Sequence, residues 1–70
     1  MVPMTFTAVI HREGNLFVAE CPEVGSVSQG VTMEEAIGNL QEATGLYLEE
    51  FPEAAPSGHS FITTFEAAHA

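Results

Sequence analysis

The sequence predicts a single α+β domain, residues 1–70, in which one helix packs on one face of one β-sheet. Three observations lead to this fold. Three short runs near 4–12, 15–20 and 25–29 have strand patterns: the first alternates apolar and polar residues, the second is an apolar run rich in strand formers, and the third is weaker. Apolar residues then recur every three or four positions over about 33–51, as in an amphipathic helix. Alternation returns over about 60–67, so the expected element order is β-β-β-α-β.

The first two strands are expected to form a β-hairpin. One face of the first strand carries Phe6, Ala8 and Ile10. Gly14 is the expected turn residue with positive φ, because glycine has no Cβ to oppose that conformation. The second strand is the apolar run Leu16–Ala19, and Pro22 ends it because proline lacks the N–H that a sheet requires. A weaker third strand ends at Gly30.

The helix has the clearest local signals in the chain. Thr32 is placed as its N-cap, and Glu35, three residues later, can close a capping box. Pro52 ends the helix near Phe51. The apolar stripe consists of Met33, Ala36, Ile37, Leu40, Ala43, Tyr47, Leu48 and Phe51. Each interior glycine costs about 1 kcal/mol relative to alanine, so Gly38 and Gly45 either admit the backbone of a partner or are drift on a solvated face.

Apolar residues point to both sides of the expected sheet, and a single helix can cover only one of them. The last strand shows this, with Phe61, Thr63 and Phe65 on one side and Ile62, Thr64 and Glu66 on the other. An uncovered apolar face generally marks an interaction surface. A chain this short also buries only about 60% of its unfolded surface. We therefore expect self-association as a dimer or tetramer.

The charge balance bears on the class of partner. Ten glutamates stand against one arginine and no lysine, which gives a formal charge of −9. Affinity for a phosphate backbone comes from Lys and Arg, so direct nucleic-acid binding is not expected. The same charge favours a basic partner protein, although it equally serves to keep a small protein soluble. Cys21 is the only cysteine, which excludes an internal disulfide and fits a reducing cytoplasm. Neither a signal peptide nor a membrane span is expected.

Catalysis, metal binding and cofactor binding are not predicted. His11, His59 and His69 have no ligand spacing. Neighbouring helical glutamates such as Glu34 and Glu35 point about 100° apart and cannot share one substrate atom. Glu20 and Glu23 should raise the pKa of the Cys21 thiol, which disfavours a nucleophilic role. No phosphate-binding glycine loop is present.

A series of short motifs runs from Ala8 to Glu53, about two thirds of the chain. The motifs are an Ala-x-Cys-Pro-Glu turn at 19–23, Ser-Gln-Gly at 28–30, a threonine N-cap followed by Glu-Glu-Ala at 34–36, and Leu-Tyr-Leu-Glu-Glu at 46–50. In this order and spacing the segment resembles a HicB-like antitoxin domain. The chain departs from many members at two places. Where many members have a Leu-Pro-Gly-Cys type of turn, this chain has Glu-Val-Gly-Ser at 23–26. At the helix positions of Gly38 and Gly45, members often have larger residues. Many also continue into a C-terminal DNA-binding segment; residues 1–70 show no such segment, so autoregulation of transcription is not expected from them.

The resemblance implies a partial ribonuclease-H-like domain without that fold's catalytic carboxylates. Such a domain is not an enzyme; it binds and masks a small, basic, HicA-like RNA-cleaving toxin by occlusion. The alternative is a stand-alone homo-oligomeric scaffold that uses its apolar surface in self-assembly. Candidate contacts to the partner are Glu20, Glu23, Ser28, Gln29, Glu42 and Glu49, and the cap residues are Thr32 and Glu35.

Overall fold

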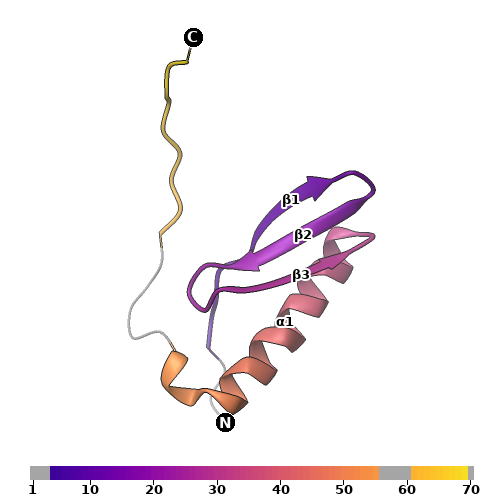
Figure 1. Ribbon diagram of the computed structural model, residues 1–70, viewed down its shortest axis with the longest axis vertical. Coiled ribbons are helices and arrows are strands. Elements are labelled where there is room, and N and C mark those ends of the chain that lie inside the picture. The colour runs from indigo at the N-terminus through magenta and orange to yellow at the C-terminus, as the bar shows by residue number, and fades with distance from the viewer. Residues whose placement is uncertain (1–3, 56–60, 70) are drawn as a thin grey trace.

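The computed structural model describes residues 4–55 and 61–69, and it confirms a small α+β fold (Figure 1). Its strands form one antiparallel sheet in the order β1-β2-β3, with β2 in the centre. Helix α1 packs across one face of this sheet and is followed by a short 3-10 turn, η1. The bounds are Val9–Glu13 for β1, Leu16–Cys21 for β2, Ser26–Gly30 for β3, Met33–Glu50 for α1 and Pro52–Ala54 for η1.

The β1–β2 hairpin is as predicted. Its register pairs Val9 with Glu20 and Glu13 with Leu16, so two residues form the loop. Gly14, the first of them, has a φ of 59°, the positive value that a type II′ turn requires at this position. β1 begins at Val9, later than the expected start near residue 4. The reason is that the Thr7 amide donates to a glutamate side chain instead of a neighbouring strand.

The helix begins where its capping residues predict. The Glu35 amide donates to Thr32 Oγ1 at 3.0 Å, which is the N-cap bond. Glu35 Oε1 accepts from the Val31 amide at 2.8 Å, so the return bond reaches the residue before the N-cap. Phe51 is the C-cap, and Pro52 starts η1. The helix therefore ends at Glu50, within one residue of its expected end.

The core lies between α1 and the β2–β3 part of the sheet. Its buried members are mostly small, namely Ala19, Cys21, Ala36, Leu40 and Thr44. Thr44 was outside the predicted apolar stripe; its Oγ1 lies 2.7 Å from Ser26 Oγ, which satisfies both hydroxyls. The stripe was too broad, because a sheet this narrow buries only the helical row at 36, 40 and 44. The stripe residues Met33, Ile37, Tyr47 and Phe51 are exposed.

The predicted fourth strand does not form within this chain. Residues 61–69 have no assigned secondary structure, and all of them are exposed. Figure 1 shows this segment extending away from the sheet and helix. Its alternating pattern suits a strand, but a strand also needs a neighbour to share its backbone hydrogen bonds. Residue 60, the expected first residue of this strand, lies outside the described residues.

Candidate partner-binding surfaces

The solvent side of α1 carries a row of acidic and glycine residues, which we call the acidic ridge. Its members, spaced by four, four, three and four positions, are Glu34, Gly38, Glu42, Gly45 and Glu49. Residues at this spacing are neighbours on one helical face. All five are exposed. The ridge therefore presents carboxylates and bare backbone to any molecule that approaches α1.

Glu34 suits the positive N-terminal end of the helix dipole, but the glycines and Glu49 of the ridge do not stabilise the helix. A Cβ added at Gly38 or Gly45 would meet no atom within 4 Å, so packing within this chain does not require glycine there. The last turn contains no basic residue but includes Glu49 and Glu50, whose charges face the negative end of the helix dipole. These residues cost helix stability, and the described part of the chain contains no contact that offsets the cost.

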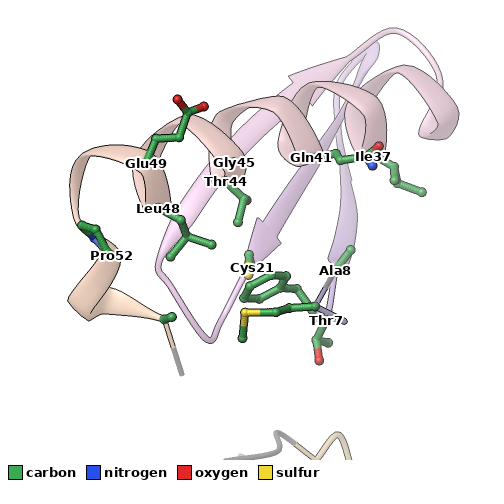
Figure 2. A pocket seen from close by; sticks show the side chains of 13 residues that line it. Thr7, Ala8, Cys21, Ile37, Gln41, Thr44, Gly45, Leu48, Glu49 and Pro52 are labelled. Carbon is green, nitrogen blue, oxygen red and sulfur yellow. The ribbon is translucent and has the colours of Figure 1, made fainter. Parts of the chain in front are cut away.

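A groove of about 770 Å³ opens next to the acidic ridge, and we call it the α1 groove. Two residues of the ridge, Gly45 and Glu49, also line the groove. Figure 2 shows it between α1 and the chain that leads into β1: Thr44 and Leu48 point from the helix toward the space near Cys21, and Thr7 and Ala8 lie on the opposite side. The groove exists because α1 lies over β2 and β3 and leaves the β1 side uncovered. The other residues that line it include Met4, Phe6, Ile37 and Gln41. Its walls are thus mainly apolar.

Glu23 fixes the position of Thr7, a residue that lines the groove in the segment before β1. The Thr7 amide donates to Glu23 Oε1 and Oε2 at 3.0 and 3.1 Å, and Thr7 Oγ1 donates to Oε2 at 2.7 Å. These bonds, led by the one from the hydroxyl, lower the pKa of Glu23 to about 2. Glu23, a predicted partner contact, is therefore engaged within the chain as a clamp.

The same carboxylate receives a hydrogen bond from Cys21. The Cys21 Sγ donates to Glu23 Oε1 at 3.4 Å, and the thiol is buried. Burial raises the pKa of Cys21, and the bond to Glu23 raises it further. Burial is thus the leading cause of the raised pKa of Cys21, whereas the sequence suggested the nearby glutamates as the cause. A buried thiol held in its neutral form is not a nucleophile.

Replacing Glu23 with glutamine should destabilise the protein at neutral pH and have little effect in strong acid. A group whose pKa falls on folding stabilises the fold above its ordinary pKa, here 4.5, and loses that contribution as the pH falls toward about 2. Urea unfolding from pH 7 to pH 2 should show a lower midpoint for Glu23→Gln that converges on wild type below pH 4.5. Glu20→Gln, which removes an equal charge from the exposed face of β2, is the control. A constant difference at every pH would contradict a role for the ionised clamp.

The remaining predicted contact residues do not gather at one place. Glu20 and Gln29 lie on the sheet face opposite α1, since neither faces the core between Ala19 and the helix. Ser28 pairs with the buried Ala19 and faces α1. Glu42 and Glu49 share the acidic ridge. The structure thus brings the six predicted contacts together only as two separate pairs, Glu20 with Gln29 and Glu42 with Glu49.

The histidines and acids do not assemble a metal site among residues 4–55 and 61–69. His11 Nε2 lies 2.9 Å from Glu13 Oε2 on the exposed part of β1, and His59 lies outside the described residues. Within the same ranges, no helix has the length and apolar character that a membrane span needs.

Comparisons with protein-family models, with curated proteins and with solved structures found no match to this chain. The surfaces must therefore be interpreted from their own chemistry. Sequence reasoning missed the groove residues Met4, Thr7, Ile37 and Gln41. The available signal was the alternation of Phe6, Ala8 and Ile10, which gives the first strand an apolar face. One helix cannot cover the apolar faces of all the strands, so part of this face was expected to stay open.

Proposed function

We propose that this chain is an antitoxin-type binding module that neutralises a small, basic, HicA-like RNA-cleaving protein by occlusion. The observation that carries the proposal is the acidic ridge of α1. Glu49 weakens the C-terminal end of the helix, and Glu42 is exposed to solvent. The two glycines of the ridge allow another backbone to approach closely. Acids and glycines that serve no purpose inside the molecule are explained if a basic partner covers them.

The proposed mechanism is steric and electrostatic, without a chemical step. An RNA-cleaving protein needs an exposed basic surface to hold the phosphate backbone. A protein with a formal charge of −9 competes for that surface and increases the rate of encounter with it. The free, buried Cys21 is compatible with the reducing cytoplasm in which such a pair would act.

The test is to capture the tagged full chain with its bound proteins from a lysate of its own source cells at moderate salt. Mass spectrometry should identify a small basic protein, and the purified partner should cleave RNA only when this chain is absent. Recovery of self-association alone, or of a partner whose RNA cleavage continues when bound, would reject the proposal. The first of these results favours the alternative, a homo-oligomeric scaffold.

Reversing two charges on the acidic ridge should weaken binding to that partner. The double variant Glu42→Lys and Glu49→Lys should lose at least tenfold in affinity, about 1.4 kcal/mol, as measured by calorimetry. Glu50→Lys with Glu53→Lys, which makes the same change in net charge at two exposed positions off the ridge, is the control. Equal losses in both variants would indicate a general charge effect and no role for the ridge.

A further inference from the structure

Three features of this fold have no partner among residues 4–55 and 61–69. The first is the outer edge of β1, whose backbone groups have no adjacent strand on that side. The second is the α1 groove, which is lined by Met4, Phe6, Thr7 and Ala8 of the segment that leads directly into β1. The third is residues 61–66, which we call the tail strand. An unpaired edge, an open apolar groove and an extended apolar segment are complementary in chemistry.

The tail strand has the composition of a strand that covers a groove. Phe61 and Phe65 are 91% and 88% exposed, and they alternate with Ile62, which is 67% exposed. The segment from Phe61 to Phe65 carries no charge. Single exposed apolar residues are ordinary, but an alternating row on an extended segment is a template for pairing with a sheet edge.

The position of the β1 edge explains where such a strand would fit. A strand added beside β1 and along the preceding residues 4–8 places alternate side chains on two opposite faces. Phe61 and Phe65, which share one face, would enter the α1 groove beside Ile37 and Leu48. Ile62, on the other face, would lie next to Val9, which begins the cross-strand row Val9, Glu20 and Val27 opposite α1. The β3 edge is less suited to an added strand because α1 already packs against β3.

We propose that two copies of this chain exchange their tail strands, each adding to the β1 edge and filling the α1 groove of the other. The structure favours a second copy because the tail strand leads away from its own groove, which stays open (Figures 1 and 2). One chain carries both the strand and its receptor, so the exchange closes with two-fold symmetry. This assembly does not depend on the proposed toxin partner.

Charge and area support the same pairing. Two chains of charge −9 repel each other, so their contact must avoid charged residues. The FITTF segment has none, and Glu49 alone is charged among the described residues that line the groove. Four phenylalanine side chains from two exchanged tails would bury roughly 600–1,000 Å². With the strand backbone and the groove walls added, this approaches the roughly 1,200–2,000 Å² of a stable interface.

The first experiment measures the mass of the full chain by sedimentation equilibrium over a range of concentrations. The proposal requires a dimer, with twice the 7.5 kDa of the chain. Phe61→Ser with Phe65→Ser should raise the dimer dissociation constant at least tenfold, and Thr63→Pro should do the same by removing a backbone donor. Leu46→Ser, which removes an exposed apolar side chain from the solvent side of α1, should leave the constant unchanged.

A mixing experiment separates tail exchange from other contacts. Ile37→Glu, which places a charge in the groove, should be monomeric although its tail is intact. Mixed with the Phe61→Ser, Phe65→Ser variant, which keeps an intact groove, it should form a heterodimer through one tail and one groove. Because neither variant associates alone, this complementation also shows that both are folded. A monomeric wild type, a tail variant that dimerises normally, or a mixture that stays monomeric would each overturn the proposal.

Discussion

Gly30→Ala should remove most of the stability of this fold, by about 2–3 kcal/mol. Gly30 ends β3 and is buried where the chain turns into α1. A Cβ at this position would lie 2.6 Å from the backbone nitrogen of Ala36 and 2.9 Å from the backbone carbon of Glu35. Both are backbone atoms of the first helical turn, so the helix itself must shift away from the sheet. Urea unfolding monitored by circular dichroism, at a fixed protein concentration, measures the loss.

The glycines of the acidic ridge provide a matched control for this prediction. Gly38→Ala and Gly45→Ala add the same methyl group where no atom lies within 4 Å. Each should raise the free energy of unfolding by about 1 kcal/mol, the helix propensity difference between alanine and glycine. Opposite signs at Gly30 and at the ridge would show that close approach, not glycine flexibility, determines the first effect. A tolerated Gly30→Ala would mean that α1 can move without loss of packing.

Those elements of the fold that depend on neighbouring residues were predictable from the sequence. Gly14 takes its positive φ because a two-residue loop demands it, and Thr32 with Glu35 fixes the helix start within four residues of chain. The position of Gly30 in the Ser-Gln-Gly motif was visible, but its reason was not. The helix turn that excludes a Cβ there contacts it only after folding.

The features that sequence reasoning missed join residues that are distant along the chain. Thr44 is buried because its hydroxyl meets that of Ser26, 18 positions earlier. Glu23 resembled a free surface acid, and its bonds to Thr7 span 16 positions. The tail strand was predicted from alternation alone, which indicates a strand but does not identify its neighbour. Among the predicted contacts, Glu42 and Glu49 came together because the helical period that relates them is local.

Leu40→Ala should unfold most of the protein at room temperature. Leu40 is 5% exposed, and it is the largest side chain in a buried cluster whose other members are Ala19, Cys21 and Ala36. Removing a buried leucine side chain costs about 2–5 kcal/mol, because small neighbours cannot collapse into the cavity. A domain of this size rarely has more than about 3–5 kcal/mol in total. The far-ultraviolet signal of α1 should therefore be reduced without denaturant.

Leu46→Ala is the control that tests whether the loss of stability in Leu40→Ala depends on the buried position of Leu40. Leu46 lies on the same helix, also as a leucine, but is 58% exposed, so its truncation should change the free energy of unfolding by less than about 0.5 kcal/mol. Both variants raise the intrinsic helix propensity slightly and by the same amount, since alanine is the strongest helix former and leucine follows closely. An equal loss at Leu46 would mean that another copy of the chain covers the solvent side of α1. The loss of stability in Leu46→Ala would then diminish on dilution. Dilution separates the copies, so residue 46 is exposed in both the wild type and the variant.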